Sequence, residues 1–281
     1  MTILQDTYTL ANGVTLPKIG FGTWQMPDGE KTYQAVRFAL DNGYRLIDTA
    51  HAYGNEASVG RAVRDSGIPR DQLFVTSKLP AEIKDHDAAL KTFDASMAAL
   101  GLDHVDLYLI HAPWPWEKMG EDFSSENEAV WKAFEAIYAS GRARAIGVSN
   151  FEVPHLETLL DGCTVKPMVD QIKYFIGNTQ SEIVSFCRAH GIQVEGFSPL
   201  ATGEILHNKE VQAMAERYGR SVSQICIRYV VQNGVVPLPK STHGERIVQN
   251  ADVEFEIEPA DMDYLDGLRE TVSVHHGPKK K

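Results

Sequence analysis

The chain has 281 residues, of which 43% are hydrophobic and 23% are charged, enough for one large buried core. Its net charge of −11 argues against non-specific binding to nucleic acids or anionic membranes, because both rely on a broad basic surface. No apolar run approaches the roughly 20 residues that span a bilayer, and no basic-then-apolar leader opens the chain. We therefore expect a cytoplasmic protein whose partner is a small molecule, and we take it to be a monomer.

The chain opens with an alternating segment around Asn12-Gly13, a pair typical of a tight turn between antiparallel strands. We expect a β-hairpin over residues 8–16 that forms a small lid on one end of the fold. Short apolar runs then alternate with helical patterns from about residue 19 to about residue 250. These runs cover residues 19–21, 45–48, 74–78, 105–111, 145–149, 168–171, 193–197 and 235–238.

The eight runs are mainly apolar and do not alternate, which indicates strands covered on both faces. The segments between them repeat apolar residues at helical spacing, for example at Leu90, Phe93, Met97 and Leu100. Eight strand–helix units predict an α/β fold, a (β/α)8 TIM barrel with an N-terminal β-hairpin and two extra helices, near residues 209–218 and 259–268. We expect one domain over residues 1–281, with a disordered tail over about 272–281.

Three of the predicted strands stop on an ionisable side chain: Asp48, Lys78 and His111. Tyr53 follows the first of these strands closely. Alone, each residue has an ordinary interpretation, since an aspartate at a strand end caps a helix, a histidine packs at the rim and a lysine is solvated. In a barrel, however, strand ends gather at one rim, where catalytic residues of such folds lie. Together the four side chains predict a proton-transfer site.

Two longer motifs carry a resemblance to a known family. Residues 43–50, read Gly-Tyr-Arg-Leu-Ile-Asp-Thr-Ala, precede Glu56 and Val59-Gly60, and residues 238–241, read Leu-Pro-Lys-Ser, precede Arg246 and Gln249-Asn250. The first motif resembles the first signature of the aldo-keto reductases, and the second resembles their cofactor-binding signature. The resemblance runs from about residue 8 to residue 270. It implies a barrel that reduces aldehydes or ketones with NADPH, without a metal or flavin.

The resemblance gives the four polar residues distinct roles. Tyr53 is the acid in reduction and the base in alcohol oxidation. Because a free tyrosine has a pKa of about 10, we expect Lys78 to lower the pKa of the phenol. Asp48 holds the ammonium in place, and His111 donates a hydrogen bond to the substrate oxygen.

The resemblance also assigns the cofactor residues. Ser149, Asn150 and Gln171 match the positions that bind the nicotinamide carboxamide, and Phe197 matches the ring on its face, with barrel core as the alternative. Two cations and a hydroxyl suit a 2′-phosphate, with an ordinary surface helix as the alternative. The two cations are Lys240 and Arg246, and the hydroxyl is that of Ser241. Gln249 and Asn250 follow at the positions that hold the adenine. The expected cofactor set also includes Gly22, Thr23, Ser198, Leu200 and Thr242.

The chain departs from the family pattern beside the catalytic histidine. Many members have His-Trp-Pro there, whereas this chain has His111-Ala112-Pro113-Trp114. The shape of the substrate pocket is therefore open, and Trp24, Trp114 and Trp116 are candidates for its apolar wall, with core packing as the alternative.

Two other functions compete with carbonyl reduction. A nucleotide-sensing regulatory protein would keep the same barrel and cofactor as a switch. A metal-dependent barrel hydrolase would use Asp48 and His111 as ligands, although no His-x-His or His-Glu-x-x-His motif offers closely spaced ligands, and we expect no metal. The three cysteines include no Cys-x-x-Cys pair and predict buried or idle thiols.

Overall fold

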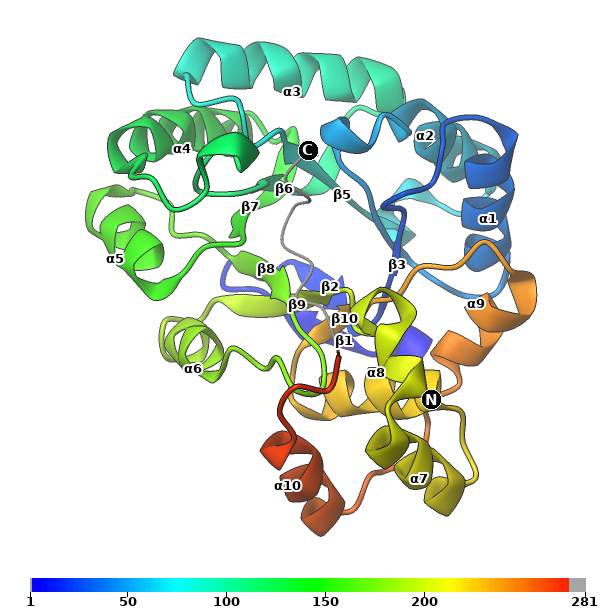
Figure 1. The fold of residues 1–281 in the computed structure, drawn as a ribbon. Coiled ribbons are helices and arrows are strands. Elements are labelled where there is room, and N and C mark those ends of the chain that lie inside the picture. The colour runs from blue at the N-terminus through cyan, green and yellow to red at the C-terminus, as the bar shows by residue number, and fades with distance from the viewer. Residues whose placement is uncertain (1, 273–281) are drawn as a thin grey trace.

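The computed structural model describes residues 2–272 and shows eight parallel strands ringed by helices (Figure 1). Each strand pairs with the next along the chain, in the order β3 to β10. The strands are β3 Gly20–Gly22, β4 Leu46–Asp48, β5 Phe74–Leu79, β6 Val105–Ile110, β7 Ala143–Ser149, β8 Val169–Lys173, β9 Gln193–Phe197 and β10 Val236–Leu238. This confirms the predicted (β/α)8 barrel, with strand boundaries that differ from the prediction by only one or two residues.

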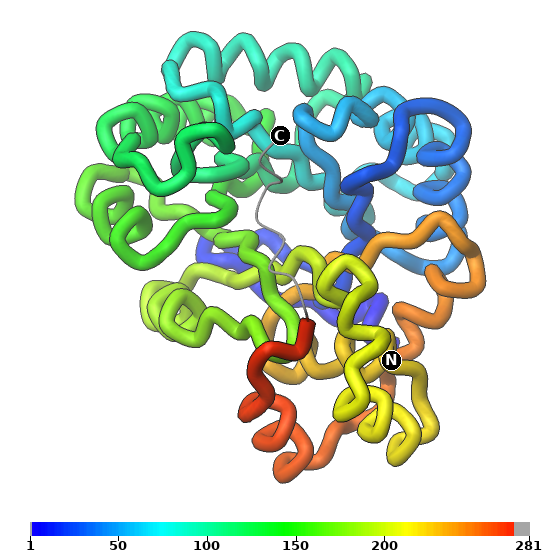
Figure 2. The backbone as a smooth tube through the Cα atoms, in the orientation of Figure 1, coloured from blue at the N-terminus to red at the C-terminus, as the bar shows by residue number. Residues whose placement is uncertain are grey.

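The helices form the outer layer of the barrel, as the backbone trace in Figure 2 also shows. They are α1 Glu30–Asp41, α2 Glu56–Asp65, α3 His86–Leu100, α4 Ser124–Ala139, α5 Val153–Gly162, α6 Ser181–Ala189, α7 Lys209–Tyr218, α8 Val222–Gln232, α9 Gly244–Ala251 and α10 Pro259–Gly267. Short 3-10 turns cover Ile3–Gln5, His51–Tyr53, Arg70–Gln72, Trp116–Lys118 and Ala201–His207.

The two extra helices, α7 and α10, stand outside the strand–helix alternation and are linked by hydrogen bonds. Arg217 Nη1 and Tyr218 Oη, at the end of α7, both donate to the carboxylate of Asp261 on α10, each at 2.5 Å. Figure 1 shows both helices on the same side of the barrel. The prediction of two additional helices near these positions is confirmed.

The barrel closes where β3 meets β10. The Gly22 N–H donates to the Pro239 carbonyl at 3.0 Å. A Cβ atom at Gly20 would lie 2.5 Å from a Leu238 side-chain carbon, closer than real side chains approach. Glycine at position 20 therefore allows the first and last strands to come together.

The N-terminal hairpin closes one end of the barrel. Its strands, β1 Thr7–Thr9 and β2 Thr15–Pro17, pair antiparallel around Gly13, whose φ of +86° suits glycine. Leu10 and Leu16 are buried in the cluster of apolar side chains that fills the barrel interior. The predicted lid therefore covers the end at which the strands begin, and the rim at which they end lies opposite.

Within residues 2–272 no helix is both long and apolar enough to cross a membrane. Cys187 and Cys226 are buried, Cys163 is half-buried, and all three are free thiols. The predicted disordered tail lies outside the described residues, apart from Val272.

Candidate active site

A buried ion pair forms the centre of the rim. Lys78, near the end of β5, is fully buried, and its Nζ donates to Asp48 Oδ1 at 2.6 Å and Oδ2 at 2.7 Å. The Thr49 carbonyl accepts a third hydrogen bond at 2.9 Å. Burial opposes the charged form of the lysine, but Asp48 and Tyr53 favour it, and the pKa of Lys78 is raised. The ammonium is therefore kept protonated inside the barrel.

Tyr53 lies on the 3-10 turn after β4, above this ion pair. Its Oη is 3.4 Å from Lys78 Nζ, which also lies 5.0 Å from the centre of the phenol ring. Burial raises the pKa of Tyr53, and although Lys78 acts in the opposite direction, burial prevails. Lys78 therefore acts in the expected direction, but the net shift is upward, because the sequence shows the neighbouring cation and not the loss of solvent around the phenol.

His111 begins the loop after β6 and completes the group of four. Its ring packs edge-on against Tyr53, with ring centres 5.6 Å apart, and against Trp116 at 5.7 Å. Burial, and next the charge of Lys78, lower the pKa of His111 to about 3, so the imidazole is neutral at neutral pH. Its Nδ1 is buried and has no hydrogen-bond partner within residues 2–272. The structure thus brings all four predicted catalytic side chains together.

A second carboxyl, which the sequence analysis missed, lies beneath them. Gln171 Nε2 on β8 donates to Asp48 Oδ1 at 2.9 Å and to Glu195 Oε2 on β9 at 2.8 Å. Glu195 is fully buried, and its Oε1 has no partner among the described residues. Burial, with Asp48 next, raises the pKa of Glu195 to about 7. Since Glu195 lies inside a strand rather than at its end, only the pairing of β8 with β9 reveals this contact.

The predicted carboxamide residues form one hydrogen-bonded chain beside His111. Ser149 Oγ donates to the Gln171 carbonyl at 2.7 Å, and Asn150 Nδ2 donates to Ser149 Oγ at 3.0 Å and to the His111 carbonyl at 2.8 Å. Phe197, at the end of β9, is half-buried. Ser149, Asn150 and Gln171 therefore lie beside the four polar residues.

Several expected cofactor residues support the rim in other ways. Thr23 is fully buried, and its hydroxyl donates to the Asp48 carbonyl at 2.9 Å, so it holds β4. Gly22 lies at the barrel closure. Ser198 and Leu200 are half-buried in the loop after β9, where Ser198 has a φ of +53°.

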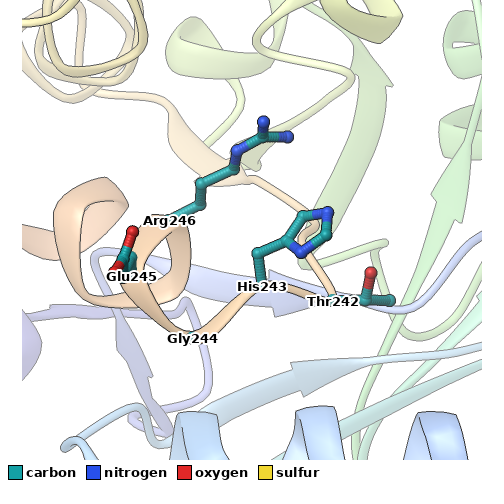
Figure 3. A pocket seen from close by; sticks show the side chains of 5 residues that line it. All are labelled: Thr242, His243, Gly244, Glu245 and Arg246. Carbon is teal, nitrogen blue, oxygen red and sulfur yellow. The ribbon is translucent and has the colours of Figure 1, made fainter.

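The predicted phosphate-binding residues lie at the start of α9, away from the ion pair. A hollow of about 470 Å³ is lined by Thr242, His243, Gly244, Glu245 and Arg246. The side chains of His243 and Arg246 extend toward the same side of this segment (Figure 3). Lys240 and Arg246 are exposed, whereas Ser241 is buried.

An additional cation, Lys31 on α1, was not expected near these residues. Partial burial, and then the charge of Lys31, lower the pKa of Lys240. Beyond the cations, Gln249 is exposed, while Asn250 is buried. The cluster therefore gathers positive charge from helices at opposite ends of the chain.

The three candidate tryptophans differ in their surroundings. Trp114 is 9% exposed and packs with Ala81 and Ala112, and its ring lies 5.4 Å from that of Trp116. Trp116 in turn packs edge-on against His111. Trp24 is 46% exposed on the loop after β3.

The chemistry of the site suits an ammonium better than a metal at Asp48. Both carboxylate oxygens of Asp48 accept hydrogen bonds from Lys78. Among residues 2–272, no group of three or more histidine, cysteine, aspartate or glutamate side chains is arranged to hold a metal ion.

Comparison with known proteins places this barrel in a family. The Aldo/keto reductase family model matches residues 18–270. The chain is 42% identical to glyoxal reductase of Bacillus subtilis (strain 168) over 278 residues, covering 99% of this chain and 98% of that one.

Solved structures give the same result. An aldo-keto reductase from a Medee basin deep-sea metagenome library is 35% identical, with a TM-score of 0.88 and coverage of 98% of this chain and 99% of that chain. The Bombyx mori aldo-keto reductase in complex with NADP is 30% identical, with a TM-score of 0.85 and coverage of 95% and 94%. With both motifs, the barrel and these matches in agreement, the chain belongs to the aldo/keto reductase family.

Proposed function

We propose that this protein is an NADPH-dependent oxidoreductase that reduces small aldehydes, dicarbonyls or keto sugars to alcohols, with Tyr53 as the proton donor. The observation that carries the proposal is the buried Lys78–Asp48 pair with the Tyr53 hydroxyl 3.4 Å from the ammonium. The similarity to a glyoxal reductase supports a small carbonyl substrate, and the NADP-bound neighbour supports the cofactor.

The residues present fit the cofactor at two places. Exposed Lys240 and Arg246 beside the hollow at the start of α9 suit the charge of a 2′-phosphate, with the Thr242 hydroxyl beside them. Ser149, Asn150 and Gln171 suit the carboxamide, and Phe197 suits the face of the nicotinamide. When bound, NADPH supplies the hydride.

His111 and Tyr53 at the rim interact with the oxygen of the substrate carbonyl. Neutral His111 retains one N–H, which donates to the oxygen and stabilises its developing negative charge. The raised pKa of Tyr53 keeps the phenol protonated at neutral pH, which is the state a donor needs. As the proton leaves, the ammonium of Lys78 stabilises the phenolate, and Asp48 holds that ammonium in position.

Oxidation of NADPH and of NADH by the purified protein tests the proposal. The panel contains methylglyoxal, aromatic aldehydes, keto esters and keto sugars, and cofactor binding is measured separately by fluorescence. We expect turnover of at least one class, with NADPH preferred over NADH. Tight NADPH binding without turnover of any compound would refute a carbonyl reductase and leave the nucleotide-sensing alternative.

A further inference from the structure

Three successive backbone carbonyls after β6 each accept a hydrogen bond from a side chain of a different element. Asn150 Nδ2 donates to the His111 carbonyl at 2.8 Å, and Lys84 Nζ donates to the Ala112 carbonyl at 2.7 Å. Asn127 Nδ2, on α4, donates to the Pro113 carbonyl at 2.7 Å. The loops after β5 and β7 and the helix α4 therefore all hold the segment that begins with His111.

The second and third of these contacts are joined. Lys84 Nζ also donates to Asn127 Oδ1 at 2.8 Å, so one side chain fixes the amide orientation of the other. Ala112, Pro113 and Asn127 are buried, where a carbonyl that loses its donor costs about 1–3 kcal/mol. Loss of either side chain therefore leaves a buried acceptor of this segment unsatisfied.

Lys84 is half-buried and donates to uncharged oxygens, which is unusual for a lysine at the mouth of a barrel. Both oxygens that accept from its ammonium are uncharged. Partial burial lowers the pKa of Lys84 to about 7, although Glu82 and Glu126 act in the opposite direction. A lysine that served only solubility would remain in water, so this geometry favours a role in holding the carbonyls.

The held segment connects His111 with Trp114, a candidate for the wall of the substrate pocket. His111 precedes Ala112, and Trp114 follows Pro113. The Ala112 methyl is fully buried against Ala81 and Trp114, so its side chain has no contact with solvent. A shift of Ala112 and Pro113 would displace the imidazole of His111 on one side of them and the indole of Trp114 on the other.

We propose that Lys84 and Asn127 are positioning residues, which fix residues 112–113 and thereby place His111 and Trp114 relative to the substrate carbonyl. The inference rests on the proposed carbonyl reduction for its effect on turnover. Small displacements of reacting groups lower rates strongly, even when the displaced contact is outside the chemistry.

Two variants with nearly unchanged volume test the proposal. Lys84→Met removes the donor to Ala112, and Asn127→Asp keeps an acceptor for Lys84 but removes the donor to Pro113. Lys132→Met, on the exposed face of α4, is the matched control. We expect kcat to fall on the order of 10-fold or more in both test variants. NADPH affinity should stay within about twofold of the parent, and KM should change more for aromatic aldehydes than for methylglyoxal.

Hydrogen exchange of the backbone amides over residues 111–116 gives a second readout that is independent of activity. Faster exchange there in both variants, with β5 unchanged, supports the proposal. Unchanged exchange with unchanged kcat overturns it, and so does a lower melting temperature with unchanged kcat. If the parent protein reduces no carbonyl compound, the proposed function is refuted instead. The exchange data then still show whether Lys84 and Asn127 hold the segment.

Discussion

The two charged regions of the site differ in what satisfies their charges. Around Lys78 the protein itself supplies the partners, since Asp48, Thr49 and Tyr53 surround a fully buried ammonium. At the start of α9, Lys240 and Arg246 are exposed beside a hollow. Charges fixed in advance stabilise a reaction with little reorganisation, whereas exposed cations gain most when a ligand brings the anion. The first region is therefore suited to catalysis and the second to binding.

Tyr53→Phe should have the largest effect, and it should distinguish the region around Lys78 from the region at the start of α9. Removal of the phenol hydroxyl should lower kcat on the order of 10³-fold, because a positioned general acid contributes roughly 10²- to 10⁴-fold. NADPH affinity should remain nearly unchanged, since the hydroxyl acts in the transition state. Steady-state kinetics and fluorescence titration measure the two quantities. A large loss of NADPH affinity would show that the buried region also binds the cofactor.

Glu195→Gln tests whether every charge of the buried region is satisfied. The folded pKa of Glu195, about 7, lies above the ordinary 4.5, so the folded state holds its proton longer. The buried carboxyl therefore costs stability as the pH rises from about 4.5 to about 7, and the cost stays constant above that range. Glu195→Gln should be more stable than the parent at pH 8, by on the order of 3 kcal/mol, and equally stable near pH 4.

Urea unfolding at several pH values measures this difference, with exposed Glu216→Gln as the control. The glutamine can still accept the hydrogen bond from Gln171, so the comparison isolates the charge. Equal stabilities of variant and parent at pH 8 would mean that a further group stabilises the charged Glu195 carboxylate in the folded protein.

Lys240→Met and Arg246→Met test the exposed region and should have the smallest effect. Each is expected to weaken NADPH binding roughly 10-fold, because hydrogen bonds to charged groups contribute about 1.5–3 kcal/mol. NADH binding and kcat should change little. Titration with both nucleotides measures the change, and exposed Lys209→Met at the start of α7 is the control. Equal losses for NADH and NADPH would place these cations at another part of the nucleotide.

The barrel and the four central residues could be predicted because their signals are local. Each strand is mainly an apolar run, Asp48 ends one of them, Lys78 lies one residue before the end of another, and His111 follows a third. Parallel strands bring such ends to one rim, so position along the chain was enough.

Contacts between distant elements could not be predicted in this way. Glu195 lies among the residues of an ordinary strand, and Lys84 and Asn127 lie in segments that carry no motif. Their partners are fixed by strand pairing and by helix packing, which sequence spacing does not reveal. The net direction of the Tyr53 pKa shift could not be predicted either, because burial outweighs the opposing effect of Lys78.

The hairpin that fills the bottom of the barrel has a practical consequence for immobilised catalysts. Leu10 and Leu16 place the N-terminal segment at the end of the barrel opposite the rim that carries Lys78 and His111. A protein tethered to a bead or an electrode through this segment would present its reactive mouth to the solution. Attachment at the N-terminus should therefore preserve more turnover than attachment through a cysteine introduced at exposed Met119, on the loop that follows Trp116.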